Sequence, residues 1–290
     1  MKPITIPTYR RIRRRIISFK KLDLIKTEQA DLIELINKSF TIPTGLFPQN
    51  PGGNPIYRAR INTDSENNFI YEPYKSKEKI SYNSNPNNYG RCNLIGKPIF
   101  YGADGLNVAI NEACNNILNK KTPTLYLTVG EWRLQRSISV SIVCHSRKAL
   151  KRSGDLIKAY QSLLILEKKK NWSKSDVRIW KIKNKFFSDE FAKEVSKGLE
   201  KNYLFSSLYS NIVLNTKDEK LKSSGLWYPS VAYRFFGHNV AYEKSLIDNG
   251  TIILEAVKHI KCTFTKKNKP PVIEIISTTD KFNDDLILWI

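Results

Sequence analysis

The chain has 290 residues, of which 41% are apolar and 26% charged, so it can build a sizeable core without disulfides and does not have the composition of a disordered chain. Lysine and arginine outnumber aspartate and glutamate 48 to 27, and the resulting charge of +21 favours polyanions or small phosphorylated molecules as partners. Four scattered cysteines and only three histidines argue against a zinc site and against a disulfide framework, and are typical of reduced thiols.

The N-terminal segment is strongly basic and contains no acidic residue. Its cations are Lys2, Arg10, Arg11, Arg13, Arg14, Arg15, Lys20 and Lys21. The apolar run beside them is too short for a secretory signal, and no later stretch reaches the roughly 18 apolar residues of a membrane span, which predicts a cytoplasmic protein with no membrane partner. The cluster has two interpretations, either a solvated tail or helix face, or a contact surface for an acidic protein or nucleic acid.

The next segments predict a division of the chain. Lys26–Phe40 has apolar residues at near-helical spacing, which predicts a helix. Thr41–Asn54 is dense in proline and glycine, which is typical of a linker. We therefore expect a basic N-terminal extension with its linker over residues 1–54, and a main domain over residues 55–290.

The main domain is predicted to begin with short strands and a helix. Strands are expected at Ile56–Ile61 and Lys97–Tyr101, and a helix at Asp104–Leu118, whose first residue can cap it. Apolar and polar residues then alternate in Leu125–Val129 and Ser137–Val143. This alternation predicts a β-hairpin.

The C-terminal half is predicted to contain helices followed by strands. The expected helices are Leu156–Lys168, Asp189–Lys201 and Tyr203–Leu214, and the expected strands are Gly225–Ala232, Ile252–Ala256, Lys261–Thr265 and Val272–Ser277. Because helices and strands are interspersed without regular alternation, the pattern indicates an α+β fold rather than a doubly wound sheet.

A candidate site lies in the stretch from Gly90 to Glu112. It combines a turn containing Arg91, a strand ending in Tyr101 and a helix that carries Glu112. Apolar residues surround this glutamate in the helix, so its carboxylate is expected at or beside the apolar face. A charge next to a core favours a functional role. The alternative is an exposed helix acid whose apolar neighbours are coincidental.

The order of these motifs resembles the RES domain family, which is named for an arginine, a glutamate and a serine. The matching pieces are Gly-Arg-x-Asn ending at Asn93, Gly-x-Pro-x-x-Tyr ending at Tyr101, and Ala-x-x-Glu ending at Glu112. Downstream, Tyr-Pro-Ser ending at Ser230 and the later Asn239 are similar to the family's last motifs. The likeness covers roughly residues 56–239, although a cysteine follows the arginine where the family has an aromatic residue.

The resemblance implies a fold like that of ADP-ribosyltransferases, with a central split β-sheet and flanking helices, to which this chain adds a small basic N-terminal helical extension. It also implies an intracellular toxin that depletes NAD⁺ by hydrolysis or phosphorolysis. Its substrates would be NAD⁺ and, for phosphorolysis, inorganic phosphate, with no metal or cofactor, and its partner would be a protein antitoxin.

The resemblance assigns a set of site residues. The catalytic set is Arg91, Tyr101, Glu112 and Ser230, and the substrate-binding set is Asn93 and Asn239, to which the sequence adds Arg58 as a second phosphate-binding candidate. Each could instead be structural: Arg91 an exposed loop residue, Tyr101 a core aromatic, and Ser230 a turn residue. The three histidines are expected to be structural.

The chemistry assigns a role to each catalytic residue. Cleavage of the nicotinamide–ribose bond develops positive charge on the sugar, and nicotinamide leaves as a neutral molecule, so no general acid is required. Glu112 would stabilise that charge or steer the nucleophile. Arg91 would bind the pyrophosphate through its fork of donors. Tyr101 would stack on the nicotinamide or ribose, and Ser230 would orient the ribose or the carboxylate.

Two other functions stay open. The same fold could transfer ADP-ribose to a protein target. A non-catalytic nucleic-acid-binding protein would also fit the charge of +21 and the arginine cluster. The carboxylate beside an apolar helix face favours an enzyme, because a binding module has no need of it.

Overall fold

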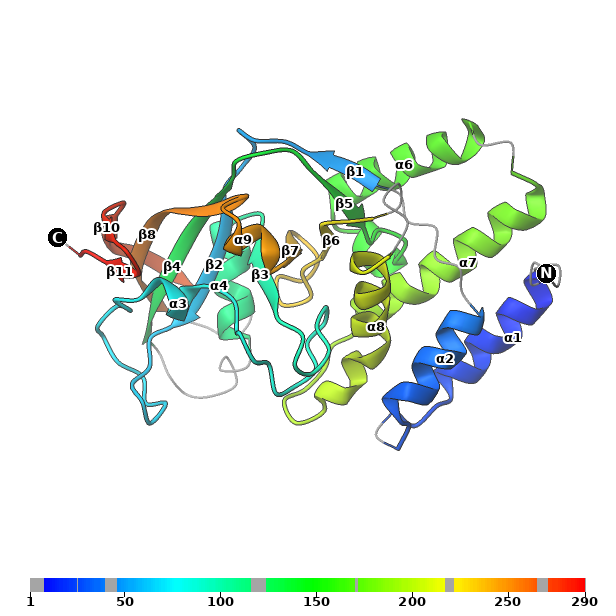
Figure 1. The fold of residues 1–290 in the computed structure, drawn as a ribbon, viewed down its shortest axis with the longest axis horizontal. Helices are drawn as coiled ribbons and strands as arrows, with labels where there is room; N and C mark the ends of the chain where they lie inside the picture. Colours follow the sequence, from blue (N-terminus) through cyan, green and yellow to red (C-terminus); the bar gives the residue numbers. More distant parts are fainter. Residues whose placement is uncertain are drawn as a thin grey trace.

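A computed structural model describes residues 8–24, 26–39, 46–115, 124–169, 172–216, 222–264 and 271–289 of the chain. This part folds as a nine-stranded mixed sheet with helices gathered mainly at one end, as Figure 1 shows. The prediction of an α+β fold is confirmed. None of the described helices combines the length and the apolar character that crossing a bilayer requires.

The helices and strands alternate irregularly along the chain. The helices are α1 (Tyr9–Lys20), α2 (Gln29–Ser39), α3 (Lys77–Ile80), α4 (Leu106–Cys114), α5 (Arg147–Leu150), α6 (Gly154–Lys169), α7 (Lys174–Phe191), the 3-10 helix η1 (Glu200–Tyr203), α8 (Leu204–Leu214) and α9 (Ser245–Asp248). The strands are β1 (Leu46–Gln49), β2 (Ile56–Ile61), β3 (Ile99–Ala103), β4 (Thr124–Leu134), β5 (Ile138–Ile142), β6 (Gly225–Pro229), β7 (His238–Glu243), β8 (Ile252–Thr263), β9 (Val272–Thr279), β10 (Phe282–Asn283) and β11 (Leu286–Ile287).

The large sheet consists of two halves with little pairing between them. Its strand order is β1-β5-β6-β7-β3-β2-β4-β8-β9, and only β5 and β6 run parallel. β2 pairs with β4 along its whole length, whereas β2 and β3 share one residue pair, Tyr57 with Ala103. The sheet therefore opens between β2 and β3, and side chains from both strands can face the space between them.

Helix α4 packs against the β2–β4–β8 half of the sheet. Ile110 and Cys114 of this helix are buried with Leu125, Leu127 and Ile260 of the strands. Their burial follows from the apolar periodicity of α4 and from the alternation along β4. This packing fixes the helix that carries Glu112 beside the opening in the sheet.

The basic N-terminal segment forms a helix that belongs to the same core as the C-terminal half. Ile12, Ile16 and Phe19 of α1 follow helical spacing and are buried. The ring of Phe19 lies 6.1 Å from that of Phe186 in α7 and 5.5 Å from that of Phe205 in α8. The division at residue 54 stays a prediction, although β1, which lies in the predicted linker, pairs with β5.

The predicted hairpin of residues 125–143 is wrong. β4 lies between β2 and β8, and β5 lies between β1 and β6, so the two strands do not pair with each other. Alternation identifies a strand but carries no information about its partner. Ile252–Ala256 and Lys261–Thr265 were predicted as separate strands, but β8 runs as a single strand from Ile252 to Thr263.

Two further expectations fail for local reasons. The predicted helix Asp189–Lys201 does not form, since α7 ends at Phe191 and Gly198 has a φ of 88°, a conformation that ends helical structure. Asp104 does not cap α4. The cap residue is Gly105, which makes no side-chain cap hydrogen bond, and the Asp104 carboxylate contacts His238 instead.

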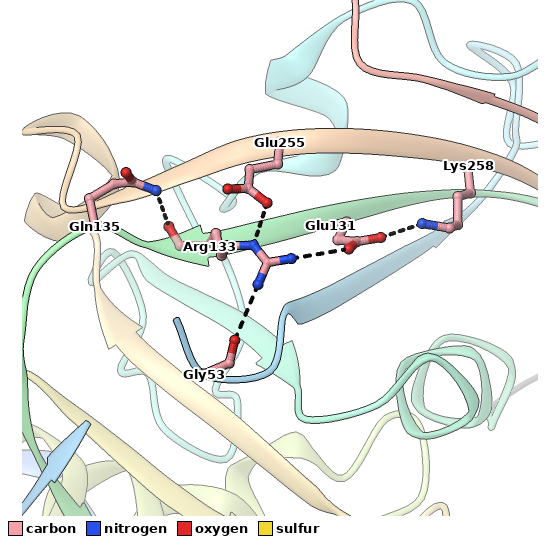
Figure 2. Close-up of polar contacts among 6 residues, drawn as sticks. All are labelled: Gly53, Glu131, Arg133, Gln135, Glu255 and Lys258. Carbon is pink, nitrogen blue, oxygen red and sulfur yellow. Dashed lines mark hydrogen bonds and ion pairs between the residues drawn. The ribbon is translucent and has the colours of Figure 1, made fainter. Parts of the chain in front are cut away.

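An ion-pair network joins β4 to β8 (Figure 2). Arg133 pairs with Glu255 and, at 3.9 Å, with Glu131, which in turn pairs with Lys258. Arg133 Nη1 also donates to the Gly53 carbonyl at 3.2 Å, which ties the segment before β2 to β4. Because the Arg133 and Glu255 side chains are partly exposed, solvent screens their attraction.

Candidate active site

A cavity of about 510 Å³ lies where the sheet opens between β2 and β3. Its walls come from these two strands, from α4, from the loop over residues 83–93, and from single residues of η1, β6 and β7. This volume lies within the usual range for small-molecule sites, about 300–1,000 Å³. Six of the seven predicted site residues line it, namely Arg58, Arg91, Asn93, Tyr101, Glu112 and Asn239.

The seventh predicted residue, Ser230, contacts the carboxylate that faces the cavity. Ser230 Oγ donates to Glu112 Oε1 at 2.6 Å, and Asn239 Nδ2 donates to the same oxygen at 2.6 Å. Glu112 Oε2 has no hydrogen-bond partner among the described residues. The two donors therefore fix the orientation of the carboxylate and leave its second oxygen for a ligand.

The two donors are themselves held firmly. Ser230 is fully buried, its N–H donates to the Gly237 carbonyl at 2.9 Å, and its hydroxyl accepts from the Tyr233 N–H at 3.1 Å. Asn239 lies in β7 between β6 and β3, where its backbone is fixed by both neighbours. Its Oδ1 is buried without a hydrogen-bond partner among the described residues, and an acceptor in that situation favours a donor from a ligand.

Tyr101 and Asn93 hold the turn that carries Arg91. The Tyr101 hydroxyl donates to Asn93 Oδ1 at 2.9 Å and accepts from the Cys92 N–H at 2.7 Å. A Cβ on Gly90 would lie 2.1 Å from Asn93 Oδ1, so a larger residue there would have to displace the Asn93 side chain or the turn. Burial raises the pKa of Tyr101 well above its usual value, and the hydroxyl stays protonated. The Tyr101 hydroxyl and Asn93 Oδ1 both have their hydrogen-bond partners within the turn, so these two residues mainly shape the site.

Arg91 connects this turn to the end of α7. Its Nη1 donates to the carbonyls of Phe191 and Lys193, the latter at 3.1 Å. The guanidinium stacks over the ring of Tyr203, 4.9 Å from its centroid, and Nη2 lies 3.5 Å from the Tyr203 hydroxyl. Carbonyls at a helix C-terminus carry partial negative charge and attract a cation. Arg91 therefore has a structural contact on one side and faces the cavity with its remaining donors.

Two arginines of β2 add positive charge to the cavity. Arg58 bridges the opening in the sheet, because it donates to the carbonyls of Ser81 at 2.7 Å and of Tyr101 on β3. Burial, and then the charge of Arg60, lower the pKa of Arg58 well below its usual value. Arg60 Nε is buried without a hydrogen-bond partner among the described residues. None of the described ion pairs involves these two arginines or Arg91, so the cavity has an excess of positive charge.

A Ser-His-Asp arrangement lies beside the site but does not face the cavity. His238 Nδ1 lies 2.6 Å from Asp104 Oδ2, and His238 Nε2 lies 2.7 Å from Ser153 Oγ. Ser153 is buried and its hydroxyl also accepts from the Leu156 N–H at the start of α6. Neither Ser153 nor His238 lines the cavity. The arrangement therefore braces the start of β7, the strand that holds Asn239.

The sequence motifs assigned no role to Arg60, Tyr203 or Tyr228, all of which line the cavity, although Tyr228 belongs to the Tyr-Pro-Ser motif. Arg60 follows Arg58 by two positions on the same strand, so strand alternation could have identified it. Tyr203 is 112 positions from Arg91 and had no local signal. Burial raises the pKa values of Tyr203 and Tyr228, which keeps both hydroxyls protonated.

Comparison with known proteins adds no assignment to this geometry. No protein-family model and no curated protein matches the chain.

Within the described residues, no group of three histidine, cysteine, aspartate or glutamate side chains is placed to share a metal ion. The four cysteines are buried and form no disulfide bond. The site is thus defined by one carboxylate, three arginines and several protonated tyrosines around a single cavity.

Proposed function

We propose that this protein is an enzyme that cleaves the nicotinamide–ribose bond of NAD⁺ in this cavity. One observation carries the proposal: the Glu112 carboxylate is held by Ser230 and Asn239 in a cavity that three arginines line. Glu112 and Asn239 are 127 positions apart in the chain. A dinucleotide needs such a combination, with cations for its pyrophosphate and an anion near its reacting sugar.

The opening in the sheet supports a fold like that of ADP-ribosyltransferases. In the fold that the motifs imply, the central sheet is split. Here the single residue pair between β2 and β3 separates the sheet into two halves, and the cavity lies at that separation. The agreement between the place of the split and the place of the carboxylate favours this fold over an unrelated α+β arrangement.

The reaction follows from the position of the carboxylate. The bond between C1′ of the ribose and the nicotinamide nitrogen breaks, and its electron pair leaves with neutral nicotinamide. Glu112 Oε2 would lie against the positive charge that develops on the ribose and would stabilise it. An oxygen of water or of inorganic phosphate then bonds to C1′, and the proton that water loses passes to the solvent. Ser230 and Asn239 keep the carboxylate aligned throughout.

The arginines would bind the rest of the substrate. Arg60 Nε and the remaining donors of Arg91 have no acceptor among the described residues, and a pyrophosphate supplies several. The buried Asn239 Oδ1 would accept a hydrogen bond from a hydroxyl or amide of the ligand. Arg58 is largely occupied by carbonyl oxygens and would contribute mainly its charge.

The test is the release of nicotinamide from NAD⁺ by the purified full chain. Glu112→Gln preserves the shape of the side chain and removes its charge, and we expect its turnover to fall by about 10²–10³-fold with unchanged thermal unfolding. Glu78→Gln, at an exposed position of α3, is the matched control and should keep full activity. Full activity in Glu112→Gln would overturn the role of the carboxylate, and an inactive wild-type chain would overturn the proposal.

The same assay distinguishes the three possible acceptors of the ADP-ribose group, which are water, inorganic phosphate and a protein. With water as acceptor the product is ADP-ribose in the presence or absence of phosphate, whereas phosphorolysis requires phosphate and gives ADP-ribose 1″-phosphate. Transfer to a protein would instead appear as label from NAD⁺ on a polypeptide. Toxicity in the cell and control by an antitoxin remain predictions from the resemblance to RES domains.

A further inference from the structure

The exposed side of α1 carries a dense group of cations. Between Thr8 and Leu22 the chain contains no acidic residue. The exposed cations of this segment are Arg10, Arg11, Arg13, Arg14, Lys20 and Lys21. The opposite side of the helix is buried against the core through Ile12, Ile16 and Phe19. The arginines are therefore presented on a rigid surface and not on a loose tail.

Within the described part of the chain, Lys20 interacts electrostatically with Glu190, but the four exposed arginines of this group are not neutralised. None of the described ion pairs involves Arg10, Arg11, Arg13 or Arg14. Arg10 and Arg14 are separated by four positions, so like charges lie next to each other on the helix surface and repel. Such a cluster destabilises its own helix unless an external anion is bound.

The charge density on the exposed side of α1 is of the same order as that of a nucleic acid. The six exposed cations lie within residues 10–21, a length of roughly 18 Å at about 1.5 Å per helical residue. This corresponds to one positive charge in about 3 Å, compared with one negative charge in about 1.7 Å for duplex DNA. Four of the six are arginines, whose planar fork of donors matches phosphate oxygens.

We propose that the exposed face of α1 binds nucleic acid through its phosphate backbone. A membrane surface is a poorer match, because an interfacial helix inserts its apolar side and that side of α1 is buried in the core. A protein partner is also a poorer match, because protein interfaces need an apolar centre. On α1 the exposed large apolar residue is Ile17, at 45% exposure. Interfaces with nucleic acid are polar and positively charged.

This surface is separate from the cavity. No residue of α1 lines the cavity, and Figure 1 shows α1 at the outer edge of the helical end, away from the opening between β2 and β3. Binding at α1 and turnover of NAD⁺ can therefore be measured independently, and a failure of one proposal leaves the other intact.

The experiment measures the binding of a labelled duplex DNA and a labelled single-stranded RNA, each of about 20 nucleotides in length, over a range of salt concentrations. The variant Arg10→Gln/Arg13→Gln/Arg14→Gln removes three exposed cations from α1. The control Lys75→Gln/Lys79→Gln/Lys281→Gln removes three exposed cations in or next to α3 and β10, two elements that Figure 1 shows at the end of the molecule opposite α1. Glutamine has a helix propensity close to that of arginine, so the helix is retained.

The expected result is a weaker salt dependence of binding in the α1 variant. If each arginine contacts one phosphate, the slope of log affinity against log salt for duplex DNA becomes less steep by about 2.7, and the affinity at about 0.15 M salt falls at least tenfold. The control should change the affinity less than threefold, and both variants should keep wild-type nicotinamide release and thermal unfolding.

Three outcomes would overturn the proposal. In the first, the wild-type chain binds neither nucleic acid. In the second, the two variants lose affinity equally, which would assign binding to the general field of the net charge of +21. In the third, a polyglutamate of matched charge competes as well as the unlabelled nucleic acid, which would assign the surface to an acidic protein partner.

Discussion

Arginines occupy two contrasting environments in this molecule. Arg58, Arg60 and Arg91 line a cavity, where burial lowers the pKa values of the first two, and Arg58 and Arg91 donate to defined carbonyl oxygens. Arg10 and Arg13 of α1 are exposed, with no described ion pair. A guanidinium removed from water interacts strongly with each acceptor within hydrogen-bond distance, whereas water and salt weaken the interactions of an exposed guanidinium.

This difference in burial indicates how each region can recognise an anion. In the cavity the identity and position of one arginine should decide affinity, because a lost hydrogen bond there is not replaced by water. On α1 the number of charges should decide affinity, and single positions should matter little. The two regions can therefore be told apart by single substitutions, pH and salt.

The largest effect is expected for Arg91→Ala. The substitution removes a cation from the cavity and leaves the carbonyls of Phe191 and Lys193 without their donor. We expect a loss of about 4 kcal/mol in transition-state binding, roughly a thousandfold in kcat/KM for NAD⁺. Arg13→Ala on α1 is the matched control and should stay within twofold. Equal losses in both variants would remove the distinction between the two environments.

His145 tests whether its buried surroundings keep a basic group neutral. Its ring packs against Tyr160 and Trp180, and burial, followed by the charge of Lys181, lowers its pKa from 6.5 to about 4. Between these pH values the unfolded chain binds a proton that the folded chain does not. The free energy of unfolding should therefore fall as the pH drops through this window, by about 3 kcal/mol in total.

Urea unfolding at several pH values from about 7 to 4.5 measures this effect. His145→Phe retains an aromatic ring and has no group to protonate, so its unfolding free energy should vary less with pH than that of the wild-type chain. An identical pH profile in the two proteins would show that His145 is accessible to protons in the folded state.

Gly90→Ala tests whether the turn positions Arg91. The added Cβ would meet Asn93 Oδ1 at 2.1 Å and the Tyr101 hydroxyl at 2.7 Å, so their hydrogen bond must break or the turn must move. We expect about 2 kcal/mol of lost stability and a fall in NAD⁺ turnover of about tenfold or more. Gly154→Ala, where a Cβ meets open space, is the control and should be neutral or slightly stabilising. A fully active Gly90→Ala protein would show that the turn tolerates movement.

The sequence predicted the elements whose pattern is local. The strand Ile56–Ile61 is found at the same residues, and most of the predicted helix Tyr203–Leu214 is α8. The pairing of strands was not predictable, because β4 and β5 take partners distant in the chain. β7 was missed because it begins with His238 and Asn239, two polar residues that are buried by contacts to Asp104 and Glu112.

The candidate site shows the same limit. The order of the motifs assigned Arg91, Glu112 and Ser230 to one predicted site, and in the structure Ser230 contacts Glu112 directly. The contacts of Arg91 with the end of α7 and with Tyr203 depend on how distant segments pack. No property of the residues around position 91 contains that information, so the double role of Arg91 is visible only in the fold.

The smallest effect is expected at the ion pairs of Figure 2, where an arginine is matched with a carboxylate in contact with water. The Arg133 and Glu255 side chains are 33% and 35% exposed. Glu255→Gln should lower the free energy of unfolding by less than about 1 kcal/mol, and by less again when the salt rises from about 0.05 to 0.5 M. Glu274→Gln, which loses an exposed pair with Lys261, should behave alike. A loss above about 2 kcal/mol that salt does not reduce would mean that Arg133 is desolvated like the cavity arginines. Exposure would then not be what separates the two environments.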